Sequence, residues 1–90
     1  MPTLISQLEA RKIMGVSRTQ FYTDMNNGLA PKSISVSERV RKQIKEEAEQ
    51  VAAAKAARLS KDEIKQLVQQ IHARREAQAA ALREQLAQGK

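Results

Sequence analysis

The sequence contains no cysteine and no tryptophan, and its only aromatic side chains are those of Phe21 and Tyr22. The absence of cysteine excludes disulfide bonds and thiolate metal sites. Aromatic side chains usually supply much of the buried area of a small core, and a domain of this size buries only about 60% of its unfolded surface. We therefore expect a modest, mainly aliphatic core, to which a second chain or bound nucleic acid would add stability.

The sequence also lacks long apolar runs and catalytic motifs. No run approaches the roughly 20 residues that span a bilayer, and no signal peptide is evident. There is no glycine-rich phosphate loop, no nucleophile elbow and no carboxylate pair at a spacing that would form a pocket. The single histidine, His72, has no companion ligands at metal spacing. We expect a cytoplasmic protein that is not an enzyme and that binds neither a cofactor nor a metal ion.

Positive charge is concentrated in the first half of the chain. Residues 1–45 hold eight Lys and Arg against three acidic residues, whereas residues 46–90 hold eight against seven, so +5 of the formal charge of +6 lies in the first half. This imbalance is typical of a protein that contacts a phosphate backbone. A basic surface that only aids solubility would have the same composition.

Residues 6–29 predict two short helices joined by a tight turn. The S-x-x-E/Q pattern of a capping box occurs at residues 6–9 and again at 17–20, and it marks two helix starts independently. Gly15 permits the turn between the helices, and Gly28 permits a left-handed exit from the second helix. Apolar residues are spaced so that the two helices close over one small core: Leu8, Ile13, Met14, Val16, Phe21, Met25 and Leu29.

After the second helix, Pro31 prevents its continuation, and residues 32–36 alternate polar and apolar side chains as a half-buried strand does. We expect Ile34 and Val36 on the buried side of this strand. The next residues, 37–42, permit two interpretations. They turn back as the second strand of a wing, or they begin a helix.

The helical interpretation rests on an apolar stripe, with Ser37 as its N-cap. The stripe consists of Val40, Ile44, Ala48 and Val51. A wing tip near residues 37–38 that passes quickly into a long helix fits both patterns.

The C-terminal part of the chain predicts a further helix. Ser60 and Glu63 form a third capping-box pattern, so this helix should begin at about Lys61. Its apolar face, formed by Ile64, Leu67, Val68 and Ile71, must pack on the N-terminal unit or on a second copy of the chain. We expect residues 1–5 to be a loosely held lead-in, and the tail beyond about residue 77 to be an exposed helix.

Two motifs resemble a known family. GVSRTQFY at residues 15–22, followed by Gly28, Pro31 and Arg39, resembles the AlpA-like and excisionase-like winged helix-turn-helix regulators of phages and prophages, whose DNA-binding unit is MerR-like. VAAAKAARLSKDEIKQLVQQIHARR at residues 51–75 resembles a C-terminal extension of some AlpA-like proteins. The resemblance covers about residues 4–75. It departs from the family at residues 42–44, where Lys-Gln-Ile replaces the usual G-W-[PR] segment.

The resemblance implies a mainly α fold with a small winged helix-turn-helix over residues 1–45 and a short or degenerate β wing. A linking helix would occupy residues 46–59, and a C-terminal helix for packing or oligomerisation would occupy residues 60–88. It also implies a sequence-specific regulator of transcription or an excision factor, bound to double-stranded DNA in a bacterium or in the host cell of a phage. Because single small modules usually gain specificity by pairing, we also expect a dimer, or several copies on repeated sites, that associates through the C-terminal helices.

A recognition helix reads base edges in the major groove while flanking cations contact phosphates. Arg18 suits guanine and Gln20 suits adenine. The residues that we expect to read bases are Ser17, Arg18, Thr19, Gln20 and Thr23. The residues that we expect to contact the backbone, directly or through the wing, are Arg11, Lys12, Tyr22, Lys32, Arg39, Arg41 and Lys42.

Two other functions remain open at this point. A small terminase subunit of a phage also joins a helix-turn-helix to helical oligomerisation elements, and it would recognise packaging DNA as a ring. A protein-interaction adaptor would use its two C-terminal helices and would show no sequence-dependent DNA binding.

Overall fold

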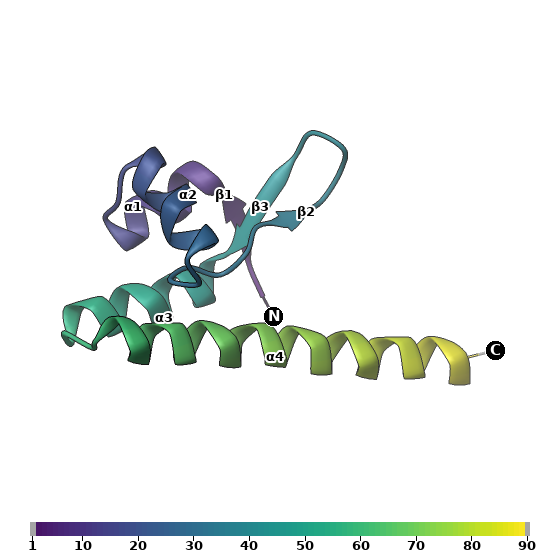
Figure 1. The fold of residues 1–90 in the computed structure, drawn as a ribbon. Helices are drawn as coiled ribbons and strands as arrows, with labels where there is room; N and C mark the ends of the chain where they lie inside the picture. The colour runs from purple at the N-terminus through teal and green to yellow at the C-terminus, as the bar shows by residue number, and fades with distance from the viewer. Residues whose placement is uncertain (1, 90) are drawn as a thin grey trace.

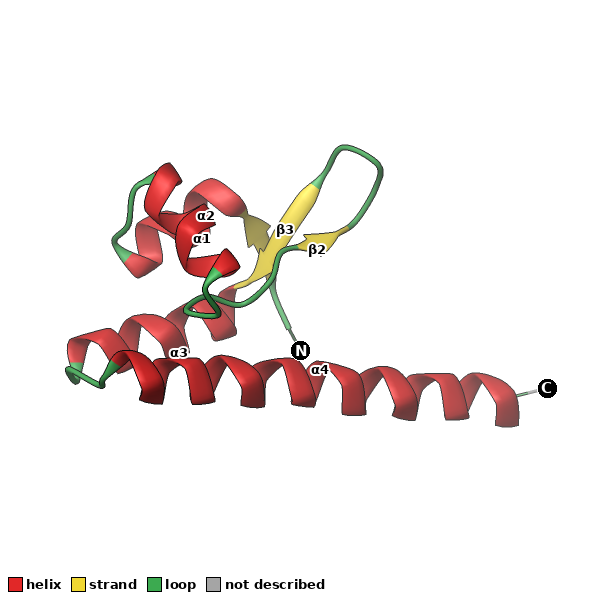
Figure 2. Ribbon diagram, in the orientation of Figure 1, coloured by secondary structure: helices red, strands yellow, loops and turns green. Residues whose placement is uncertain are grey.

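The computed structural model describes residues 2–89, which form a mainly helical fold with a small three-stranded antiparallel sheet (Figure 1). The elements in chain order are β1 (Leu4–Ser6), α1 (Gln7–Met14), α2 (Arg18–Asn26), β2 (Ile34–Ser35), β3 (Arg41–Ile44), α3 (Lys45–Ala56) and α4 (Lys61–Gln88). The short helices α1 and α2 and the sheet lie on one side of the long helix α4, and α3 runs beside its first half (Figure 2). Within residues 2–89, no helix has both the length and the hydropathy needed to cross a membrane.

The three helix starts predicted from capping-box patterns are confirmed. Ser6, Ser17 and Ser60 each accept a hydrogen bond from the backbone N–H three residues later. The complete reciprocal box forms at Ser60, where the Glu63 carboxylate accepts the Ser60 N–H at 3.0 Å. At Ser17 the Gln20 side chain bonds elsewhere, so its capping is one-sided.

The two glycine turns are also confirmed. Gly15, at the end of α1, has a φ of 71°, and Gly28, just beyond α2, has a φ of 76°. Both values lie in the left-handed region that residues with a Cβ rarely adopt. These turns set the direction of the chain into α2 and out of it.

The first residues are not a loosely held lead-in, because Leu4–Ser6 form a strand at the edge of the sheet. The strand order is β1-β3-β2, with Ile5 opposite Gln43 and Ile34 opposite Lys42. The N–H of Lys45 donates to the Thr3 carbonyl at 2.8 Å. Strand β1 pairs with residues distant in the sequence, which is why its local sequence did not reveal it.

The interpretation of residues 37–42 as a helix start is wrong. Residues 41–44 form strand β3, and the loop before them is closed by the N–H of Val36, which donates to the Val40 carbonyl at 2.9 Å. Helix α3 begins only at Lys45 and has Ile44, rather than Ser37, as its N-cap. Pairing on both sides, with β1 and β2, holds residues 41–44 in an extended conformation despite their helical apolar spacing.

Two apolar side chains expected in the core are exposed. Strand β2 ends at Ser35, so Val36 lies in the hairpin loop rather than on a buried strand face. Leu8 lies on the solvent side of α1. The buried core is mainly aliphatic and consists of Ile5, Ala10, Met14, Phe21, Ala30, Ala48, Val51, Ala54, Ile64, Val68 and Ile71.

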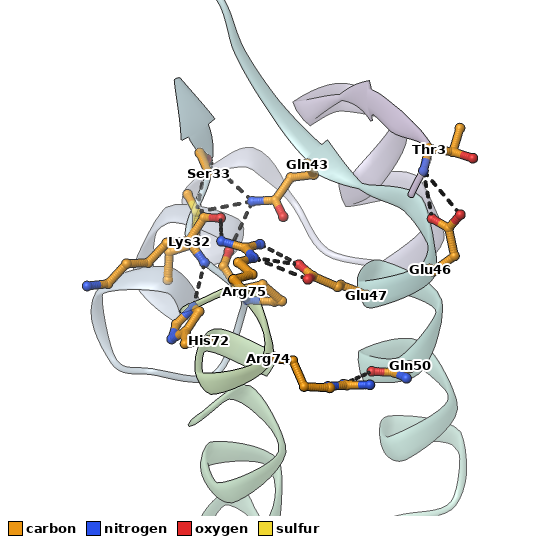
Figure 3. Close-up of polar contacts among 12 residues, drawn as sticks. Thr3, Lys32, Ser33, Gln43, Glu46, Glu47, Gln50, His72, Arg74 and Arg75 are labelled. Atoms are coloured by element: carbon orange, nitrogen blue, oxygen red, sulfur yellow. Dashed lines mark hydrogen bonds and ion pairs between the residues drawn. The ribbon is translucent and has the colours of Figure 1, made fainter. Parts of the chain in front are cut away.

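The buried amide of Gln43 ties the sheet to the segment that follows α2 (Figure 3). Its Nε2 donates to the Pro31 carbonyl at 3.0 Å and lies 3.3 Å from the Ser33 Oγ. Its Oε1 is buried and has no hydrogen-bond partner among the described residues. Pro31 lies outside the helices, so its buried carbonyl needs another partner, and the hydrogen bond from Gln43 satisfies it and fixes the path from α2 to β2.

The C-terminal helices pack back onto the N-terminal unit. This was one of the two arrangements expected to bury the apolar face of α4, the other being packing on a second copy of the chain. The Arg75 guanidinium joins three segments: it binds the Glu47 carboxylate of α3, and its Nη1 donates to the Lys32 carbonyl at 2.9 Å (Figure 3). His72, one turn earlier, accepts the Lys32 N–H on its Nε2 at 3.1 Å. Both backbone polar groups of Lys32, its N–H and its carbonyl, are therefore hydrogen-bonded to side chains of α4. These two bonds hold the loop before β2 against that helix.

This contact predicts a loss of stability below neutral pH. Burial lowers the pKa of His72 from its ordinary value, and the nearby cations of Arg75 and Lys32 lower it further. As the pH falls below about 6.5, the unfolded chain therefore takes up a proton before the folded chain does, and the stability that neutral His72 provides is lost progressively toward its folded pKa.

The melting temperature should accordingly fall between about pH 7 and pH 5. His72→Gln, whose side-chain carbonyl still accepts the Lys32 N–H, should remove most of this slope. The thermal transition followed by circular dichroism would measure it, and equal slopes in the two proteins would contradict the assignment. Glu46 acts at lower pH, because the Thr3 backbone N–H lowers its pKa and its contribution is lost only below about pH 4.5.

Candidate nucleic-acid interface

Helix α2 has one buried face and one polar, exposed face. Phe21 and Asp24 are buried and Met25 is half-buried, so these three side chains define the inward side of the helix. With 3.6 residues per turn, exposed residues that follow one another at intervals of three, one and three positions lie together on the outward side of the helix. These residues are Thr19, Tyr22, Thr23 and Asn26. Asn26 belongs to this face although the sequence-based prediction omitted it.

The first turn of α2 adds a cation to this face. Arg18 is exposed, and its guanidinium carbon lies 5.9 Å from the centroid of the Tyr22 ring, within range of a cation–π interaction. Arg11 of α1 lines the same depression of about 210 Å³ as Arg18 and Tyr22. Two of the predicted backbone-contacting residues, Arg11 and Tyr22, are therefore brought to the predicted base-reading residue Arg18.

The β2–β3 hairpin flanks one side of the outward face. A depression of about 400 Å³ lies between Tyr22 and Asn26 of α2 and the cationic residues Lys32 and Arg41. Successive side chains of a strand point to opposite faces, so Arg41 shares the face of the buried Gln43, which contacts the segment after α2. Two of the predicted backbone-contacting residues, Lys32 and Arg41, thus lie beside α2.

The predicted basic cluster of the hairpin is divided between two faces. Lys42 lies on the face opposite to Arg41, across from Ile34 and Ser6. Arg39 is exposed in the hairpin loop. Lys12 is exposed in the last turn of α1, and it does not line the depressions that border α2. Of the seven predicted backbone contacts, these three do not join the others beside the outward face.

The turn between α3 and α4 flanks the other side of the outward face. A second depression of about 400 Å³ lies between Gln20, Thr23 and Asn27 of α2 and the cations of Lys55 and Lys61. Neither lysine was predicted as a DNA contact, because both follow α2 by some thirty residues and the motif at residues 51–75 that contains them implies no DNA contact. We call the outward face with its four flanking cations the α2 surface: Arg18, Thr19, Tyr22, Thr23 and Asn26, with Lys32, Arg41, Lys55 and Lys61.

A polar chain links Gln20 to α3. The Gln20 Nε2 donates to the Asp24 Oδ1 at 2.6 Å, and the Lys55 Nζ lies 3.5 Å from the Asp24 Oδ2. One of the two N–H donors of the Gln20 amide is therefore used by Asp24, and the second N–H and the carbonyl oxygen remain available to a ligand. Asp24 is buried, so its contact with Lys55 also fixes α2 against α3.

Two hydroxyls of the predicted base-reading set are already hydrogen-bonded within the helix. The Ser17 Oγ accepts the Gln20 N–H as the N-cap of α2, and the Thr23 Oγ1 donates to the Thr19 carbonyl at 2.9 Å. Each hydroxyl retains hydrogen-bonding capacity, since a hydroxyl has one donor and two acceptor sites. Arg18 therefore has the largest uncommitted set of donors among the predicted base-reading residues.

Among residues 2–89, no three His, Asp or Glu side chains are grouped so as to hold a metal ion. The chain was compared with protein-family models, with curated proteins and with solved structures, and none of them matches it.

Proposed function

We propose that this protein binds double-stranded DNA in a sequence-specific manner, as a transcriptional regulator or excision factor of the phage and prophage type. The observation that supports this proposal is the α2 surface, where an exposed polar helix face is flanked by cations on both sides. The major groove is about 12 Å wide and admits one α-helix. With α2 in the groove, its two flanks face the phosphates of the two strands.

In the proposed complex, α1 and α2 act as a helix-turn-helix and the β2–β3 hairpin acts as a wing. Arg18, Thr19 and Asn26 face base edges, while Lys32 and Arg41 on one flank and Lys55 and Lys61 on the other contact the backbone. Arg39, at the exposed hairpin loop, contacts the backbone or the minor groove. The depressions that line α2 leave its outward face accessible to a duplex.

The departure from the family pattern at residues 42–44 is compatible with this proposal. Where the resembling regulators carry an aromatic, this chain buries Gln43, whose amide ties β3 to the Pro31 carbonyl. Hydrogen bonding by a buried amide thus supplies a connection between the wing and α2. The family resemblance of residues 15–31 and the cations that flank α2 support the same function.

Substitution of Arg18 tests base reading. Arg18→Ala should weaken binding to a selected site by about 1–3 kcal/mol while changing binding to random DNA much less, because a bidentate contact to guanine is lost. Arg41→Ala should weaken both by similar factors, because a phosphate contact carries no sequence information.

The selected site would come from binding-site selection on random DNA, and affinities would be measured by fluorescence anisotropy at one salt concentration. Arg74→Ala is a matched control, since Arg74 lies beside Gln50 between α3 and α4 and borders no depression of α2. Equal losses on selected and random DNA for Arg18→Ala would refute the assignment of Arg18 as a base-reading residue.

A further inference from the structure

Helix α4 continues its core-facing stripe beyond the part of the molecule that covers it. Ile64, Val68 and Ile71 on this stripe are buried, but Leu82 and Leu86 are 59% and 74% exposed. Positions 64, 68, 71, 75, 79, 82 and 86 follow one another at intervals of three or four, so the two leucines point to the same side as the buried residues. The last ten residues of α4, 79–88, extend about 15 Å along this line.

The charged residues beside this stripe follow a regular pattern. Glu76 and Arg83 are seven residues apart, so they lie on the same flank of the stripe, nearly two turns from each other. Gln78 and Gln85 occupy the opposite flank at the same interval. Glu84 lies on the far side of the helix, away from the stripe. Residues 76–88, which we call the tail, therefore carry an acidic and a basic group on one flank, at the spacing of one heptad.

We infer that this tail binds the tail of a second copy of the chain in an antiparallel orientation. With Ala79 of one copy opposite Leu82 of the other, antiparallel pairing places Glu76 of each copy opposite Arg83 of its partner. The same register places Gln78 opposite Gln85. A contact of this kind is isologous, so the one pattern supplies both halves of the interface and forms two ion pairs.

Charge complementarity selects this orientation. In a parallel pair, residues on the flank of Glu76 and Arg83 face the flank of Gln78 and Gln85, so neither charge meets its opposite. A depression of about 350 Å³ beside α4 lies where the C-terminal end of the second copy's helix would come. It is lined by Lys32, His72, Arg75, Glu76, Ala79 and Arg83. The end of the second copy's helix runs toward this depression in the register described.

The test measures self-association without DNA, so its result does not depend on the proposed function. Sedimentation equilibrium of the full chain should show a reversible dimer. Arg83→Glu and Glu76→Arg should each weaken it by about tenfold or more, because each change converts two attractive pairs into repulsive ones.

A mixture of the two variants should form a heterodimer at least as readily as the unaltered protein forms its dimer. In that heterodimer each pair again joins a carboxylate to a guanidinium. Glu84→Arg is the matched control, because it reverses a charge beside Arg83 but on the far side of the helix, and it should leave the dimer unchanged. All these residues are exposed, and circular dichroism would verify that each variant keeps its helical content.

A protein that stays monomeric at all accessible concentrations would overturn the inference. So would an unchanged dimer in Arg83→Glu, or two variants that do not associate when mixed. Single-cysteine variants establish the orientation, since the chain has no cysteine of its own. Gln78→Cys and Gln85→Cys, mixed and oxidised, should yield the mixed disulfide in preference to either symmetric one, and the opposite preference would exclude the antiparallel pair.

Discussion

Phe21→Ala should lower the free energy of unfolding by about 3–5 kcal/mol. Phe21 is the only phenylalanine in the chain, is 1% exposed and lies on the inward face of α2. The cavity left by the lost ring would be lined mainly by aliphatic side chains on short helices, which can collapse only partly around it. Since small domains have a total stability of about 5–15 kcal/mol, this single change would leave a measurable unfolded fraction at room temperature.

Urea denaturation followed by circular dichroism would measure this loss, with Tyr22→Ala as the control. Tyr22 is the neighbouring aromatic residue and is 40% exposed, so its truncation removes a similar ring from the surface of the same helix. We expect Tyr22→Ala to cost about 1 kcal/mol, mainly through its tilted contact with the Phe21 ring. If both substitutions destabilised the protein equally, the inward orientation of Phe21 would be wrong.

The second large effect concerns salt. If Arg11 and the four flanking cations of the α2 surface contact phosphates, binding involves about five phosphate contacts and releases their counterions. The logarithm of the association constant should then fall with the logarithm of the salt concentration with a slope of about −4.5, which corresponds to a loss of roughly 500-fold between 50 and 200 mM salt.

Single substitutions distinguish the two flanks in this measurement. Lys61→Ala and Arg41→Ala should each make the slope shallower by about 1, whereas Arg74→Ala should leave it unchanged. A slope that changes for Arg41→Ala but not for Lys61→Ala would limit the backbone contacts to the hairpin side. A slope near zero in the unaltered protein would contradict the proposed DNA binding itself.

The starts and ends of the helices could be predicted because each depends on residues within one turn. Ser6, Ser17 and Ser60 cap helices through an N–H three residues away, and Gly15 and Gly28 adopt a left-handed conformation that other residues resist. The apolar stripe of α4 was equally visible, since it repeats within a single helix. These features follow from local dihedral preferences and from helical periodicity.

The sheet could not be predicted in the same way. Residues 40–51 carry a helical stripe, yet Arg41–Ile44 form a central strand because β1 and β2 satisfy the backbone groups on both of its sides. A three-residue strand such as Leu4–Ser6 is too short to show a period of two. Pairing between distant segments therefore determined both the first strand and the start of α3.

The sequence by itself determined the pair of short helices, the polar outer face of the second and the basic character of the first half. Only the tertiary structure placed Lys55 and Lys61 beside α2. The tertiary structure also places Arg41 and Lys42 on opposite faces of the sheet, and it brings the Gln20 amide into a hydrogen bond with Asp24. The physical reason is that a helix face follows from local periodicity, whereas the neighbours of that face depend on how α3 and α4 fold back across the molecule.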